Sequence, residues 1–144
     1  VANMATLFVD PAQSPYDMTR LKWYLRRFEN VLFEQLGYGF DFAKDALGDL
    51  IAPSQRYQYQ LQQGFMPVLP LDKPDIALTG EQLLTWYQCL QDETMFNQMM
   101  QQDFDLAKQL VNSISAMHRH LMDNLLNYQT LQSRELWQQL TQYQ

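Results

Sequence analysis

Apolar and polar positions repeat with the period of a helix over most of the chain. From Pro15 onwards, apolar side chains recur every three or four residues, at Leu21, Leu25, Phe28, Leu32 and Leu36. This spacing predicts a long amphipathic helix whose apolar stripe is centred near Leu25, Phe28 and Leu32. Gly37 follows at the position where a left-handed residue commonly ends a helix.

In the middle of the chain, apolar and polar residues alternate with a shorter period than that of a helix. Tyr57 and Tyr59 alternate with glutamines, and an apolar run resumes after Gly64. This alternation predicts a small β-hairpin inserted at residues 53–70, with prolines that limit the length of its strands. The preceding segment, residues 40–51, fits either a short helix or a compact loop.

Helical periodicity returns in the second half. Thr79 and Gln82 have the spacing of a capping box at the start of a helix. A longer helix is predicted from Phe96 to Asn127, with a break near Gln102, and a short last helix from Ser133 to Tyr143. The inward-facing residues of the last helix are expected to be Leu136, Trp137 and Leu140. The pattern predicts a mainly α-helical domain over residues 1–144 with the β-hairpin as an insertion.

Composition narrows the class of protein. The 144 residues fit one domain, and an apolar content of 47% is high enough to build a core. No apolar run approaches the roughly 18–20 residues that cross a bilayer, so a membrane partner is not expected. Ten basic residues against sixteen acidic ones give a net charge of −6. Because nucleic-acid affinity depends mainly on Lys and Arg, this chain alone is expected to bind DNA poorly.

The residues that usually carry enzyme chemistry do not converge. Cys89 falls in the middle of an apolar helical run, where a cysteine acts as a small hydrophobic side chain. His118 and His120 are two residues apart, so on a helix they point in nearly opposite directions and do not share a metal. Glycine loops that bind phosphate are absent from the sequence. We therefore expect no enzyme activity, no metal and no cofactor.

Two adjacent arginines stand out in the first helix of an acidic chain. On a helical wheel Arg26 lies beside Lys22, with Phe33 on the same flank, whereas Arg27 lies on the other flank. A border that is both basic and apolar suits an acidic peptide that carries an aromatic residue. The alternative is a solvated helix flank with an Arg26–Glu29 pair of small energetic weight.

Three blocks of the sequence resemble one family. "LRRFENVLFEQLGYGFDF", then "YQYQLQQGFMPV" followed by "TGEQL", and finally "RHLMDNLLNYQTLQSREL" occur in the order and spacing of the C-terminal domain of bacterial RecO. RecO is a DNA repair and recombination mediator. The matches extend from about Leu21 to Leu140 and so cover most of the chain.

The chain departs from the family pattern in two respects. RecO proteins begin with a small oligonucleotide-binding barrel, and no part of this sequence resembles one. Many relatives also carry four zinc-binding cysteines after the L-G-Y-G motif, whereas residues 42–65 contain no cysteine. The resemblance therefore implies a C-terminal domain without its N-terminal barrel and without a zinc site.

The resemblance implies a mediator rather than an enzyme. RecO loads recombinase onto DNA coated with single-stranded DNA-binding protein (SSB), works with RecR, and anneals complementary strands. Its helical domain docks the acidic, Phe-terminated tail of SSB, and Arg26 matches the basic position of that pocket. Arg119 and Arg134 match basic positions of the last block, with a role in docking or in pairs that stabilise helix ends. DNA would be bound mainly through the missing barrel.

Two other functions fit the same residues. One is a helical adaptor unrelated to repair, in which the motif matches are coincidental. The other is direct nucleic-acid binding by this domain, which requires a basic face with aromatic residues. If the chain acts as the family does, it works in the bacterial cytoplasm and at the nucleoid during repair.

Overall fold

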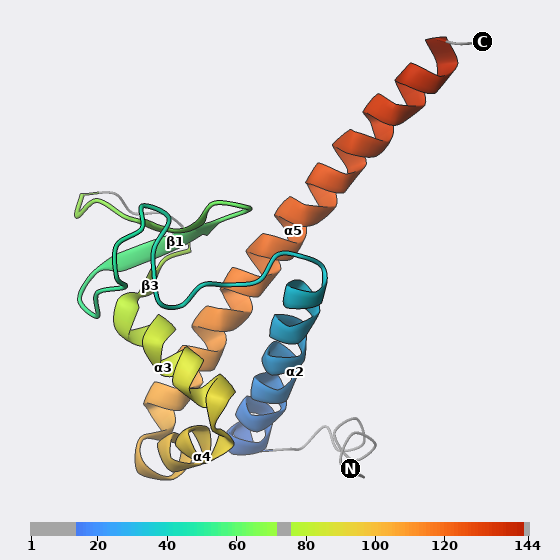
Figure 1. The fold of residues 1–144 in the computed structure, drawn as a ribbon. Helices are drawn as coiled ribbons and strands as arrows, with labels where there is room; N and C mark the ends of the chain where they lie inside the picture. The colour runs from blue at the N-terminus through green and yellow to red at the C-terminus, as the bar shows by residue number, and fades with distance from the viewer. Residues whose placement is uncertain (1–13, 72–75, 143–144) are drawn as a thin grey trace.

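A computed structural model describes residues 14–71 and 76–142 of the chain. Along these ranges the elements are α2 (Pro15–Gln35), β1 (Arg56–Gln60), β2 (Gly64–Pro67), β3 (Leu78–Thr79), α3 (Gly80–Gln91), α4 (Glu93–Gln102) and α5 (Phe104–Gln142). Figure 1 shows α2, α3 and α4 gathered around the first half of α5, with the sheet beyond α3. The second half of α5 projects away from the other elements. The predicted class, mainly helical with a small hairpin, is confirmed.

Local signals at both ends define α2. The Ser14 hydroxyl accepts a hydrogen bond from the Asp17 backbone N–H at 3.3 Å, and Pro15 occupies the first turn, where it loses no hydrogen bond. At the other end Gly37 has a φ of 89°. The Tyr38 N–H donates to the Phe33 carbonyl at 2.8 Å, which completes the C-terminal cap. The predicted end of the helix at Gly37 is confirmed.

The buried face of α2 differs from the predicted one. Trp23 and Phe33 are fully buried, whereas Phe28, at the centre of the predicted stripe, is 65% exposed. The Trp23 ring stacks on Phe96 of α4 at 4.7 Å between centroids. Both faces of α2 carry apolar residues. The face that carries Trp23 and Phe33 is the buried one, because large aromatic rings bury the most area. The predicted stripe centre was therefore wrong.

The hairpin pairs β1 with β2 in antiparallel register, with Tyr59 opposite Phe65. Gln62 in its turn and Gly64 at the start of β2 both have positive φ. β3 pairs with the other edge of β1, so the order is β2-β1-β3. This third strand was not predicted because its two residues lead directly into α3. Residues 40–51 form a compact loop rather than a helix.

α3 and α4 begin at strong caps. Thr79 and Gln82 form the predicted capping box, in which each side chain accepts a hydrogen bond from the backbone N–H of the other residue. Asp92 caps α4 through the Thr94 N–H at 3.0 Å. Asp103 then separates α4 from α5, which confirms the predicted break near Gln102.

α5 continues where two helices were predicted. The chain has neither glycine nor proline between Asn127 and Ser133, so no residue interrupts the helix before Gln142, where the described residues end. The short last helix predicted from Ser133 is therefore wrong. The residues expected to face inward from it are exposed: Leu136, Trp137 and Leu140.

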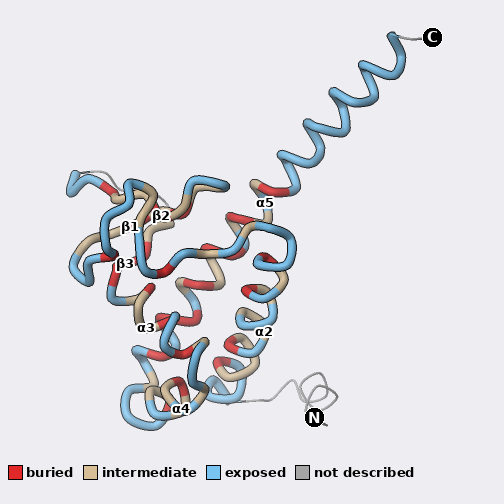
Figure 2. The backbone as a smooth tube through the Cα atoms, in the orientation of Figure 1, coloured by how far each residue is buried: buried red, intermediate tan, exposed pale blue. Residues whose placement is uncertain are grey.

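The core lies along the first half of α5. Its buried residues there recur at helical spacing: Ala107, Leu110, Val111, Ile114, Met117, His118, Leu121 and Leu125. Figure 2 shows burial concentrated where α2, α3, α4 and the sheet surround this half, and exposure along the projecting half. Within the described ranges, no helix has the length and apolar character to cross a membrane.

Candidate functional site

A groove of about 240 Å³ lies between α2 and the middle of α5. Residues of both helices line it: Arg26, Glu29, Ser115, His118, Arg119, Met122 and Asp123. Two arginines and two acidic residues thus border one groove, although the two helices are far apart in the sequence. The packing of α2 against α5 therefore brings Arg26 and Arg119 to the same groove.

Arg26 and Glu29 form an ion pair on the α2 side of the groove. Arg26 Nε lies 2.7 Å from Glu29 Oε1, and Arg26 Nη2 donates to Oε2 at 3.3 Å. Both side chains are partly buried. The pair proposed as an alternative to docking is therefore present, but Arg26 borders a groove rather than a freely solvated flank. A guanidinium has five N–H donors, so this pair uses only part of the Arg26 capacity.

His118 connects α5 to this pair. Its Nδ1 lies 3.0 Å from Glu29 Oε1, at hydrogen-bond distance. The imidazole ring is buried, stacks on Phe40 at 5.8 Å between centroids and meets the edge of Phe33 at 5.2 Å. Its Nε2 is buried and has no hydrogen-bond partner among the residues described. Glu29 is therefore held between a cation from its own helix and an imidazole from α5.

The pKa values of His118 and Glu29 are both lowered, for different reasons. Burial lowers the pKa of His118, the Arg26 charge adds to this, and the bond to Glu29 only partly opposes it. Burial alone would raise the pKa of Glu29, but the His118 hydrogen bond and the Arg26 charge outweigh it and lower the pKa. At neutral pH the cluster therefore holds an ionised Glu29, a charged Arg26 and a neutral His118.

The lowered pKa of His118 predicts that mild acid destabilises the fold. In the unfolded chain His118 takes up a proton near its ordinary pKa of 6.5, whereas the folded state resists protonation. The contribution of neutral His118 to the free energy of unfolding is complete above the ordinary pKa. It is lost as the pH falls toward the lower pKa that His118 has in the folded state. The free energy of unfolding in urea should decrease between about pH 7 and pH 5.5, by at most about 1.4 kcal/mol per pH unit for one proton.

His118→Gln should flatten this pH dependence, because glutamine keeps a donor for Glu29 and does not titrate. His120→Gln is the matched control: the residue lies on the same helix, outside the buried cluster, and bonds Asn124. The control should keep the wild-type slope. An equal slope in wild type and His118→Gln would contradict the assignment.

The structure brings together only some of the residues predicted for the site. Lys22 donates to Asn112 of α5 at 3.4 Å, so it lies on the same α2–α5 seam as Arg26. Arg119 faces the groove from α5. Lys22, Arg26 and Arg119 thus form a basic seam between the two helices.

The remaining predicted residues lie elsewhere. Phe33 is fully buried in the core and has no surface to offer a peptide, which corrects its predicted place on the border. The Arg27 guanidinium lies 5.3 Å from the Trp23 ring centre, on the other flank of α2 as predicted. Arg134 lies on the projecting half of α5, 15 residues beyond Arg119, or roughly 22 Å along the helix.

Glu29, His118 and Met122 were not predicted as groove residues. Glu29 was recognised only as a partner of Arg26, and His118 only as a histidine that does not share a metal with His120. Their meeting depends on the alignment of α2 with α5, which the sequence pattern does not reveal. The available signal was a histidine within an otherwise apolar helix face, because a buried histidine requires a polar partner.

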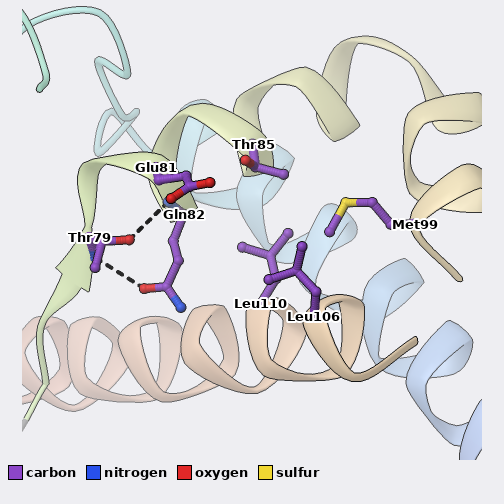
Figure 3. A pocket seen from close by; sticks show the side chains of 7 residues that line it. All are labelled: Thr79, Glu81, Gln82, Thr85, Met99, Leu106 and Leu110. Atoms are coloured by element: carbon purple, nitrogen blue, oxygen red, sulfur yellow. Dashed lines mark hydrogen bonds between the residues drawn. The ribbon is translucent and has the colours of Figure 1, made fainter. Parts of the chain in front are cut away.

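A second pocket, of about 220 Å³, opens between α3 and the start of α5 (Figure 3). Met99, Leu106 and Leu110 form its apolar side, and the capping-box residues Thr79 and Gln82 lie opposite. Glu81 is the charged residue among the seven that line it. The lining of this pocket has a carboxylate and no basic residue, whereas the lining of the α2–α5 groove has two arginines, so the groove is the better candidate for an acidic peptide.

The other candidate groups are the thiol of Cys89 and the side chains that could hold a metal ion. Cys89 is buried in α3, and burial raises the pKa of its thiol to about 11, so it stays protonated at neutral pH. In the part of the chain that the structure describes, no three His, Cys, Asp or Glu side chains cluster so as to hold a metal ion.

Comparison with known proteins identifies relatives for most of the chain. It is 32% identical over 114 residues to DNA repair protein RecO of Psychromonas ingrahamii, which covers 78% of this chain and 43% of that protein. It is 34% identical over 117 residues to DNA repair protein RecO of Pseudoalteromonas translucida, covering 81% and 44%. A third, from Aliivibrio salmonicida, is 41% identical over 61 residues, covering 42% of this chain and 25% of that protein.

The matches extend well beyond the short motifs. No family model matches the sequence. The chain spans a little under half of the length of the first two relatives. By sequence, this chain belongs to the RecO proteins, and its similarity to under half of each of these two relatives is consistent with a RecO C-terminal domain.

Proposed function

We propose that this chain is a non-enzymatic protein-interaction domain of a RecO-type DNA repair mediator, and that its α2–α5 groove docks the acidic C-terminal tail of SSB. Through that contact it helps to load recombinase or to anneal strands, with RecR as a further partner and DNA bound mainly by the barrel of a full-length protein. The relatives named DNA repair protein RecO support the repair role. The bacterial cytoplasm and the nucleoid are the corresponding location.

One observation carries the choice of surface: Arg26 and Arg119, from different helices, border one groove. A carboxylate bound between two guanidinium groups gains charge-assisted hydrogen bonds from both. Arg119 is exposed and meets the incoming carboxylate first, whereas Arg26 contributes donors that Glu29 leaves over. Lys22 extends the positive charge along the seam toward the start of α2.

The aromatic end of the peptide needs an apolar contact. Phe33 is buried, so Met122, which lines the same groove, takes that role. A methionine thioether adapts its shape to a ring and contacts aromatic groups favourably. Asp123 and Glu29 border the groove as well, and they oppose acidic residues of the peptide. The peptide is therefore expected to place its terminal carboxylate at Arg119 and its other acidic residues toward Lys22.

The direct test is fluorescence anisotropy of a labelled acidic peptide ending in phenylalanine, titrated with the 144-residue chain. Arg119→Glu should weaken binding at least tenfold, which corresponds to about 1.4 kcal/mol, because it replaces an attraction by a repulsion. Arg134→Glu changes the charge equally but roughly 22 Å away, so its affinity should equal that of wild type. Amidation of the peptide terminus should weaken binding by a similar factor to Arg119→Glu.

Several outcomes would contradict the proposal. Absence of binding by the folded domain would leave a helical adaptor of another kind. Equal losses in Arg119→Glu and Arg134→Glu would indicate attraction by overall charge rather than by the groove. Tight, strongly salt-dependent binding of labelled single-stranded DNA by this domain would favour direct nucleic-acid binding instead.

A further inference from the structure

The projecting half of α5 has no partner among the residues that the structure describes. Every side chain of residues 126–142, here called the α5 extension, is exposed. Figure 2 shows this segment as one continuous exposed helix beyond the core. In proteins, most of the stability of a helix comes from the packing of its apolar face against a neighbour. The α5 extension therefore has a face that lacks its stabilising contact.

That face is a stripe of large apolar side chains. Leu126, Leu136, Trp137 and Leu140 are 58%, 57%, 69% and 53% exposed. At 3.6 residues per turn they fall within about 100° of one another around the helix, with Ser133 near the centre of the arc. Leu126, Ser133 and Leu140 are each separated by seven residues, the spacing of a helix–helix seam. These four residues and Ser133 are called the apolar stripe below.

The apolar stripe is complementary to a second copy of itself that runs in the opposite direction. If two copies of the α5 extension pair in antiparallel fashion about Ser133, Leu126 of one copy faces Leu140 of the other. Each Trp137 then faces Gln129 of the second copy, whose side-chain amide offers an acceptor for the indole N–H. Serine at the centre is small enough for close approach of the two helices. A two-fold symmetric interface requires this self-complementarity.

Charge also favours a second copy at this surface. The whole chain carries a net charge of −6, so most faces of two copies repel one another. The α5 extension contains one basic residue, Arg134, and one acidic residue, Glu135, and is neutral overall. Both lie away from the centre of the apolar stripe on a helical wheel, at roughly 105° and 155°. Two copies can therefore meet here without like charges facing each other.

We propose that the apolar stripe of the α5 extension is a homodimer interface, in which a second copy of this chain packs antiparallel about Ser133. The extension spans about 17 residues, or roughly 25 Å of helix. Stable interfaces usually take roughly 20–30 residues from each side, so this pair is a weak dimer that forms with rising concentration. The proposal does not depend on the groove or on its peptide.

Analytical ultracentrifugation over about 1–500 µM tests it. The average mass should rise from the monomer value of 17.1 kDa toward twice that value. Leu126→Glu should keep the protein monomeric throughout the range. Leu131→Glu is the matched control, because Leu131 is also 58% exposed but lies roughly 165° from the stripe centre, and it should dimerise like wild type. Circular dichroism should show that both variants stay folded.

Cysteine crosslinking tests the arrangement of the pair. Under a mild oxidant, Ser133→Cys should form a disulfide-linked dimer, whereas Gln138→Cys, on the opposite side of the helix, should not. A mixture of Leu126→Cys and Leu140→Cys should link unlike chains, because an antiparallel pair places these positions together. The native Cys89 is buried and does not interfere.

Three results would overturn the proposal. The first is a constant monomer mass up to the highest concentration. The second is equal loss of association in Leu126→Glu and Leu131→Glu, which would show that another surface is responsible. The third is crosslinking of Leu126→Cys only to itself, which would mean a parallel pair.

Discussion

Replacing Phe33 by alanine is expected to lower the free energy of unfolding by about 3–5 kcal/mol. The ring is fully buried, meets Phe40 edge-on at 5.9 Å between centroids and contacts the His118 ring at 5.2 Å. Alanine would leave a cavity in a cluster that also positions the imidazole against Glu29. The expected loss of stability therefore combines the hydrophobic free energy of burying the ring, which alanine does not supply, with the cost of the cavity. Urea unfolding followed by circular dichroism measures it.

Phe28→Ala is the matched control for this experiment. It removes the same ring from the same helix, but Phe28 is 65% exposed. Its effect should stay within roughly 0.5–1 kcal/mol, as for surface substitutions in general. The opposite ranking, with Phe28→Ala more damaging than Phe33→Ala, would place the predicted Leu25–Phe28–Leu32 stripe in the core and contradict the observed packing of α2.

The second large effect is expected at Gly80, the first residue of α3. A Cβ placed there would lie 1.9 Å from the Ala52 carbonyl oxygen and 2.6 Å from its carbonyl carbon. The Gly80 N–H donates to the Gln55 carbonyl at 2.7 Å, and the next N–H donates to Pro53 at 3.0 Å. Because the obstacle is backbone and is held by these bonds, Gly80→Ala should cost about 3 kcal/mol, at the upper end of overpacking effects.

Gly48→Ala separates this clash from the general cost of replacing a glycine. Gly48 has a φ of 89°, and a Cβ at this position would have no neighbour within 4 Å. Its substitution should cost about 1–2 kcal/mol, from backbone conformation alone. The urea midpoints of the two variants give the comparison. A Gly80→Ala protein as stable as wild type would mean that the 51–53 segment moves freely away from α3.

Features with local causes were predictable from the sequence. The end of α2 at Gly37, the capping box at Thr79 and the alternation of Tyr57 and Tyr59 each depend on residues a few positions apart. The break between α4 and α5 is of the same kind, since Asp103 interrupts the helical pattern. Such features need no knowledge of what packs against them, so their predictions agree with the structure.

Features that depend on distant contacts were not predictable in the same way. α2 has apolar residues on two faces, and only the positions of Phe96 and α5 decide that Trp23 and Phe33 are buried. The Glu29–His118 contact joins residues 89 positions apart. Arg26 was selected from its wheel position and from the RecO motif, yet its link to His118 through Glu29 required the fold.

The length of α5 also gives the molecule a lever. Its first half is anchored by the core from Ala107 to Leu125, while residues 126–142 extend roughly 25 Å without support from the described residues. A tilt of about 10° at the anchored half would move the tip of a rod of that length by about 4 Å. Small changes in the packing of α2 against α5 therefore produce larger displacements at the Gln142 end of α5. A molecule bound in the α2–α5 groove and a molecule bound at the Gln142 end of α5 would therefore be held at an angle that is set by the packing of α5 against the core.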